Sequence, residues 1–189
     1  MATDLGADAE AGLATGLDVF GAGLGEIATV SGSTEVNVSG TSTTIRADIY
    51  GGGKAGAVDG NTVVNATNLI LDGEIFGGGL GTTARVGNSA SNDGSTTVNI
   101  SGTSTVLKKN IYGGGSAGPV YGNTTVTMPE GEVKQNVFGG GLEAVVTGNT
   151  NVNVSGGTAG NVYGGGSEGN VDGVATVNVT NAKEVLGNI

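Results

Sequence analysis

The chain has 189 residues, no cysteine, histidine or tryptophan, forty glycines and a formal net charge of −10. These absences exclude disulfides and thiol chemistry and remove the commonest general base, while the negative charge argues against nucleic acid or an anionic membrane as a partner. No apolar stretch approaches the roughly 20 residues of a membrane-spanning helix.

Residues 1–17 lack the pattern of the rest, and we expect them to form an N-terminal cap or a degenerate first repeat. Residues 18–189 are predicted to form one repeat array. Six aromatic residues mark this array, and each opens a glycine-rich tripeptide: Phe20, Tyr50, Phe76, Tyr112, Phe138 and Tyr163.

The aromatic residues are separated by 30, 26, 36, 26 and 25 residues, and they alternate strictly between Phe and Tyr. Leucine follows the glycines after each Phe, whereas lysine or serine follows them after each Tyr. We call the segment from one aromatic residue to the next a coil. The alternation predicts two coil types that together form one genetic unit.

A second marker in each coil is a run that resembles Thr-x-Val-Asn-Val, beginning at Thr34, Thr62, Thr96, Thr124, Thr150 and Ala175. Its strict alternation of apolar and polar residues predicts a strand with one buried face. The fourth position forms a polar column of Asn37, Asn65, Asn99, Thr127, Asn153 and Asn178. Stacked amides can hydrogen-bond from coil to coil, so we expect this column to set the register.

These features predict an all-β fold, a single-stranded parallel β-solenoid of about six coils of roughly 25 residues. The usual crossover preference predicts a right-handed winding. Glycine and asparagine supply the positive φ values that tight corners need. The leucine framework of leucine-rich repeats is missing, and the coils are longer than those of hexapeptide β-helices.

Differences in coil length predict where loops leave the common cross-section. The aromatic residue and the polar column are 15 to 17 residues apart in five coils and 23 apart after Phe76, which predicts a protruding loop at residues 87–94. The second variable edge contains residues 41–48 and 103–110. The loops at 87–94 and 103–110 are the favoured contact surfaces.

Five of the seven basic residues precede an aromatic strand and are expected to line one edge of the rod: Arg46, Lys108, Lys109, Lys134 and Lys183. Positive charge along an edge guards against unwanted strand pairing. We favour this role over the alternative, a contact stripe for an acidic glycan.

The aromatic column is expected to be packing rather than an exposed platform for sugars. The aromatic residue and the Val or Ile before it must face opposite ways, so one of these two columns lies outward or at a corner. Ranks of threonine beside the Asn column raise ice binding as an alternative, although Glu35, Val63 and Pro129 interrupt them.

We expect no catalytic residues, no cofactor and no metal. Structural calcium at the glycine-rich corners is an alternative, but residues 164–173 lack the nonapeptide spacing of calcium-binding rolls. The chain stops at Gly187-Asn188-Ile189, where the pattern predicts another aromatic residue next. This favours a piece of a longer array over a protomer whose open end stacks on another copy.

The succession of Val/Ile-aromatic-Gly-Gly-Gly, a Gly-Asn-Thr step and Val-Asn-Val-Ser-Gly-Gly is clearest at residues 137–166. It resembles the repeats of bacterial β-helical adhesin-like surface proteins, including autotransporter passenger-type arrays. The resemblance covers about nine tenths of the chain. It implies a secreted or wall-attached stalk or adhesin whose partner is a host or neighbouring cell surface.

We therefore expect a non-catalytic extracellular rod that is structural or adhesive. Two alternatives remain open: a glycan-binding module along the solenoid flank, and a filament subunit that stacks end to end.

Overall fold

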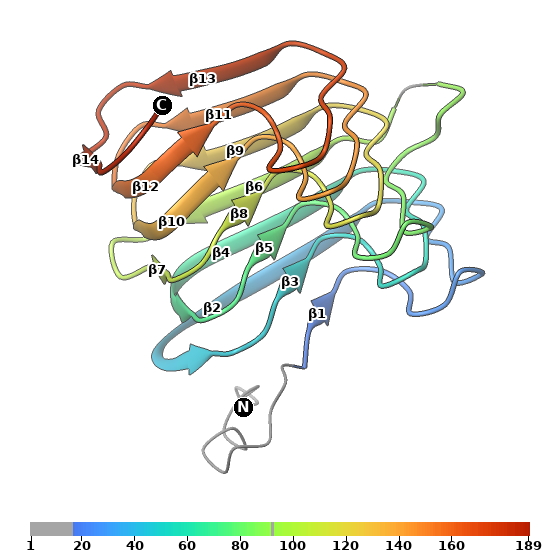
Figure 1. Cartoon of the computed structure of the whole chain (residues 1–189). Coiled ribbons are helices and arrows are strands. Elements are labelled where there is room, and N and C mark those ends of the chain that lie inside the picture. The colour runs from blue at the N-terminus through green and yellow to red at the C-terminus, as the bar shows by residue number, and fades with distance from the viewer. Residues whose placement is uncertain (1–16, 92) are drawn as a thin grey trace.

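The computed structural model describes residues 17–91 and 93–189 and shows a parallel β-solenoid of about six turns, with a repeat of roughly 26 residues (Figure 1). The predicted fold class is confirmed. Of the predicted cap at residues 1–17, only Leu17 lies within the described residues. The right-handed winding and the two coil types remain predictions from the sequence.

One side of the solenoid is a sheet of six parallel strands, here called the long-strand sheet. These strands contain the Thr-x-Val-Asn-Val runs and pair in register, so that Thr62 lies between Thr34 and Thr96. They are β2 (Thr34–Ile45), β4 (Thr62–Leu71), β6 (Thr96–Ser101), β9 (Thr124–Met128), β11 (Thr150–Val154) and β13 (Ala175–Val179). The equal register of the five successive pairs over the Thr-x-Val-Asn-Val run makes each position of that run a straight column along the rod.

A second set of parallel strands ends at the aromatic residues. These are β1 (Val19–Phe20), β3 (Ile49–Tyr50), β5 (Ile75–Phe76), β8 (Ile111–Tyr112) and the ends of β10 (Glu132–Phe138) and β12 (Thr158–Tyr163). Between this set and the long-strand sheet, single parallel bridges join the valines at 30, 58, 86, 120, 146 and 171. The valines hold the glycine-rich corner of each coil against its neighbours.

The second variable edge contains a third strand position, which the sequence analysis missed. Ile45 at the end of β2 pairs with Leu71, and Leu71 pairs with Leu107 of β7 (Val106–Leu107). The column continues through the starts of β10 and β12 to β14 (Glu184–Val185). Residues 41–48 and 103–110 are therefore partly strand. Each of these two segments also contributes an apolar side chain, Ile45 or Leu107, to the core.

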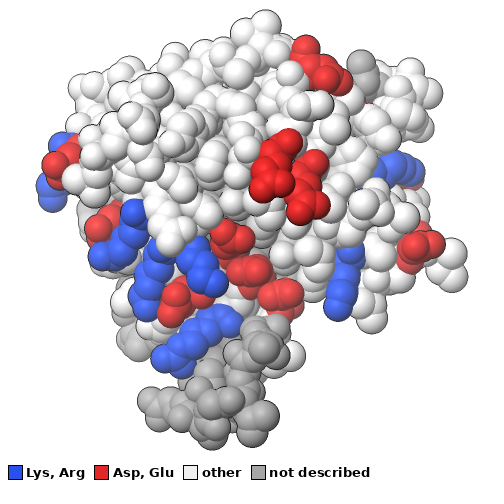
Figure 2. Space-filling view, viewed as in Figure 1, with Lys and Arg blue, Asp and Glu red and all other residues white. Residues whose placement is uncertain are grey.

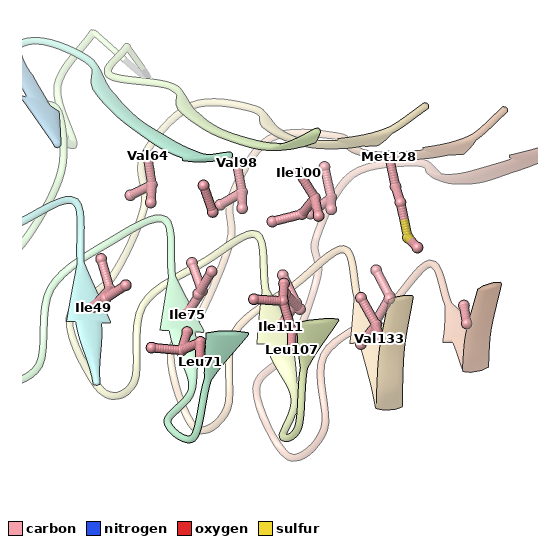
Figure 3. Packing of buried hydrophobic residues seen from close by; sticks show 14 of the residues in the cluster. Ile49, Val64, Leu71, Ile75, Val98, Ile100, Leu107, Ile111, Met128 and Val133 are labelled. Atoms are coloured by element: carbon pink, nitrogen blue, oxygen red, sulfur yellow. The ribbon is translucent and has the colours of Figure 1, made fainter. Parts of the chain in front are cut away.

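The main core lies between these strand sets and runs along the rod (Figure 3). Val64, Val98, Ile100 and Met128 enter it from the long-strand sheet. Opposite them lie Ile49, Ile75 and Ile111 from the aromatic strands, and Leu71, Leu107 and Val133 from the third strand position. Each of these side chains is at most 1% exposed. Burial of such apolar area is the largest favourable term in folding.

Buried threonines open five of the long strands, and each one bonds to the next coil. The hydroxyls of Thr34, Thr62, Thr96, Thr124 and Thr150 donate to the carbonyls of Gly51, Gly77, Gly113, Gly139 and Gly164. Each acceptor is the first glycine after an aromatic residue. The residues on either side of this glycine accept backbone hydrogen bonds from the neighbouring coil instead. On either side of Gly77, for example, Phe76 O accepts from Gly51 N and Gly78 O accepts from Gly52 N.

The same corner explains why a glycine must follow the aromatic residue. A Cβ atom on Gly51 would lie 2.3 Å from Gly77 O and 3.1 Å from the Cβ of Thr62. Backbone and hydrogen-bonded threonine cannot both move aside, so only glycine fits. The aromatic-glycine marker and the threonine marker are thus two halves of one contact between coils.

The predicted loop at residues 87–94 protrudes from the cross-section (Figure 1). Gly87 and Gly94 close its base with φ values of 79° and 89°. They lie so close together that a Cβ on Gly94 would meet Gly87 Cα at 2.1 Å. The loop leaves and rejoins the coil at one point, so its length does not disturb the stacking.

We predict that Thr96→Val destabilises the solenoid by about 1 to 3 kcal/mol, because it leaves the buried Gly113 carbonyl without a donor. Thr97→Val, the neighbouring residue on the outer face, is the matched control and should change stability by less than about 0.5 kcal/mol. Urea-unfolding midpoints followed by circular dichroism measure both. Equal effects of the two substitutions would contradict the role given to the buried hydroxyl.

Candidate functional surfaces

The six aromatic rings form one continuous stack outside the main core. Successive ring centroids are 4.8 to 5.1 Å apart, and the ring planes differ by 3° to 14°. The four middle rings are 1% to 8% exposed, and Leu80 and Leu142 of the glycine-rich corners pack against the stack. The residues before the rings, such as Ile49, enter the main core instead. Both columns are therefore buried, and the rings serve as packing.

Two tyrosine hydroxyls in this stack titrate abnormally. Burial raises the pKa of Tyr112 from 10.0 to about 12, and the charge of Glu74 adds to the rise. Burial also raises the pKa of Tyr50, with smaller contributions from Asp48 and Asp18. Both tyrosines stay neutral well above ordinary pH, so neither supplies a general base.

The predicted Asn column forms hydrogen bonds along the outer face of the long-strand sheet. Asn65 Nδ2 donates to Asn37 Oδ1 at 2.8 Å, and Asn99 Nδ2 donates to Asn65 Oδ1 at 2.8 Å. The same bond joins Asn178 to Asn153 at 2.9 Å. Thr127 stands between the two runs of amides. The column therefore links coils in register, as an amide ladder does in stacked β-structures.

A second polar column, which the sequence analysis missed, precedes the buried threonines. The side-chain oxygens of Asn61, Asn123 and Asn149 accept the backbone N–H of Ser95, Asn149 and Val174, each at 2.8 Å. The signal was present as the repeated Asn-Thr pair at 61–62, 123–124 and 149–150. It has the same effect as a cap, because it satisfies a backbone donor where the strand begins.

A third polar column, also missed, lies two residues before the aromatic rings. Asp48 Oδ1 accepts the backbone N–H of Glu74 at 2.8 Å, and Glu74 Oε1 accepts from Asn110 Nδ2 at 2.9 Å. Asn110 in turn accepts from Asn136, and Asn136 accepts from Asn161. The column changes from carboxylates to amides along the rod. The signal was present in part, as the asparagine that recurs two residues before the ring in the last three of these coils.

The predicted basic edge carries charges of both signs (Figure 2). Asp72 follows the third strand position between Arg46 and Lys108, and Lys108 Nζ lies 3.2 Å from Asp72 Oδ2. Lys134 Nζ lies 3.6 Å from Glu132 Oε1. Arg46, Lys109, Lys134 and Lys183 are exposed, and Lys108 is half-buried. This pairing of opposite charges fits a guarded edge better than a stripe that attracts acidic ligands.

Two shallow hollows lie on the described surface. One is lined by residues of the turn at 103–105, by Glu130, Glu132, Lys183 and Glu184, and the other by Asn and Thr residues of β9, β11 and β13. Within residues 17–91 and 93–189, no group of three or more acidic side chains is placed to hold a metal ion. The described residues include no helix long and apolar enough to cross a membrane.

Comparisons with known protein families, with curated proteins and with solved structures gave no match. The β-solenoid fold is shown by the structure itself. The likeness to bacterial adhesin-like arrays rests on the repeat pattern alone.

We predict that Tyr50→Phe with Tyr112→Phe reduces the loss of stability in alkali. The folded state keeps both hydroxyls protonated above the ordinary pKa of 10.0, so the parent's stability is complete below that pH and falls as the pH rises toward about 12. Urea-unfolding midpoints at intervals from pH 8 to 12 measure the slope. Tyr121→Phe removes a hydroxyl outside the stack and is the control. An unchanged alkaline slope in the double variant would refute the assignment.

Proposed function

We propose that this chain is a non-catalytic extracellular rod of a bacterial surface, serving as a stalk or an adhesin segment. The observation that carries the proposal is the use of side chains for contacts between coils. Buried threonines, stacked rings and the polar columns each join a coil to the next one. Such a structure forms a stiff rod whose length grows with the number of coils. Its free energy of unfolding is approximately a sum of contributions from the coils and from the contacts between neighbouring coils.

The arrangement of polar groups supports a structural role over catalysis. Among the described residues, no buried side-chain nitrogen or oxygen lacks a hydrogen-bond partner. Enzyme sites gather groups whose pKa is tuned for proton transfer in a hollow. Here the two tyrosines with raised pKa lie within the buried stack of aromatic rings and not in a hollow of this kind.

Adhesion is assigned to the loops that leave the cross-section, above all residues 87–94. The loop contains Asn88, Ser91 and Asp93, which are exposed. Asp93 Oδ1 accepts the backbone N–H of Asn88, and Asn88 Oδ1 accepts that of Ala90. Loops held on a rigid scaffold can vary in sequence at little cost in stability, so they commonly carry recognition.

We predict that a chain with residues 88–93 replaced by two glycines keeps its melting temperature within a few degrees but loses attachment to cells or matrix. The reason is that the closed loop base contributes little to stacking. Bead-bound protein, counted on cell layers after washing, measures attachment, and circular dichroism measures melting.

Deletion of residues 112–137 is the matched variant, because it removes one whole coil and joins Ile111 to Phe138. Thr96 would then bond to Gly139, and the protein should fold and attach as before, shortened by about 4.8 Å. If the protein still attaches after the loop is replaced, the loop is not the adhesive surface, and only the stalk role of the rod is left. Failure of the coil deletion to fold would contradict the additive rod.

A second candidate is self-association through a strand edge. Within the described residues β13 pairs with β11 alone, and the nearby Val174 and Leu186 are 67% and 62% exposed. An exposed edge of this kind presents unpaired backbone groups that can pair with a second copy of the chain. Light scattering against concentration tests this: growth into rods of uniform width supports a filament subunit, and a constant monomer mass opposes it.

A further inference from the structure

The outer face of the long-strand sheet is almost free of charge. Three columns of outward side chains cover it, and all but three of these residues are serine, threonine or asparagine. The exceptions are Glu35 and Val63, at the edge of the first two coils, and Pro129. From β6 to β13 the face carries no charged side chain, although the chain has 24 charged residues (17 acidic plus 7 basic).

Part of this face has unused hydrogen-bonding capacity. The central amides bond to one another, and Thr67 bonds to Ser101 at 2.9 Å. In contrast, the hydroxyls of Thr97, Thr125 and Thr176 have no side-chain partner among the described residues. Each hydroxyl can donate and accept. All three lie in one column, in which Thr97 and Thr125 are one strand spacing of about 4.8 Å apart and Asn151 lies between Thr125 and Thr176.

A shallow hollow crosses the same face. It is lined by Thr125, Asn151, Thr176 and Asn178, with Asn149 and the exposed Val174 at its rim. Asn178 Nδ2 donates to both Asn151 and Asn153, which holds the amides in place. The hollow thus offers fixed amides, free hydroxyls and one apolar side chain.

The chemistry of the face excludes most classes of ligand. A protein partner needs buried aromatic or aliphatic anchors, nucleic acids and acidic glycans need cations, and a lipid surface needs apolar or basic side chains. From β6 to β13, the face offers none of these beyond Val174 and Pro129. An uncharged sugar polymer needs donors and acceptors that match its hydroxyl groups, together with a small apolar contact.

We propose that this face binds an extended, uncharged polysaccharide, with the hollow at Thr125 and Thr176 as its main contact. The inference rests on the proposed role at a surface and names the ligand class of one flank of the rod. Hydrogen bonds from the fixed amides and free hydroxyls orient the polymer. The absence of charge makes the interaction independent of salt.

The test is depletion of the whole chain from solution by insoluble cellulose and chitin, with affinity electrophoresis in soluble mixed-linkage β-glucan and in alginate as the anionic contrast. We expect binding to at least one neutral polymer, no binding to alginate, and the same binding at 50 mM and 500 mM salt. Thr125→Ala with Thr176→Ala should weaken binding by about tenfold.

Ser116→Ala with Ser167→Ala removes two hydroxyls from the glycine-rich corners and is the matched control, expected to bind like the parent. Circular dichroism checks that all variants fold. The proposal is overturned by binding to no neutral polymer, by equal loss in both double variants, or by salt-sensitive binding to alginate alone. Inhibition of ice recrystallisation without glycan binding would also overturn it. Cell attachment that persists without neutral-glycan binding refutes this inference and leaves the proposed rod function intact.

Discussion

The hydrogen bond from a buried threonine to a glycine carbonyl of the next coil constrains the rest of the structure. At the aromatic corner the chain turns, and the carbonyl of the first glycine points into the coil rather than along the axis. A buried carbonyl without a donor is costly. Thr62, reaching Gly77 across the interior, satisfies it. This bond fixes the distance between corner and strand, and therefore the cross-section that all coils must share.

Several features follow from that shared cross-section. Gly51 must be glycine, because Gly77 O and Thr62 fill the space that a Cβ would need. The aromatic rings, one per coil at the same place, must stack at the strand spacing, which explains their nearly parallel planes. Extra residues can be inserted only where they leave and return at a single point, as between Gly87 and Gly94. The local sequence rules are consequences of one contact between neighbouring coils.

The sequence predicted the features that recur with the same residue types, namely the aromatic-glycine corners, the alternating strands and the Asn column. It also predicted the protruding loop, which interrupts an otherwise constant spacing. The third strand position was missed although Ile45, Leu71 and Leu107 each lie five residues before an aromatic residue, because the residues between differ from coil to coil and form no alternating run. The orientation of the rings also needed the structure. A strand leaves two choices, and only the packing of Leu80 and Leu142 shows that the outer side is buried as well.

Stacking also limits which surface side chains can repeat. A residue in one coil faces its counterpart about 4.8 Å away, and like charges at that distance repel. On the charged edge Asp72 lies between Arg46 and Lys108, and runs of like charge stay short. Lys134 alone follows Lys108, and the carboxylates at 18, 48 and 74 give way to amides at 110, 136 and 161. Amides and hydroxyls both donate and accept, so they can repeat without such a penalty. The long, regular surface of this rod is therefore its neutral one, which is why we propose a polymer with a regular array of hydroxyls as its ligand.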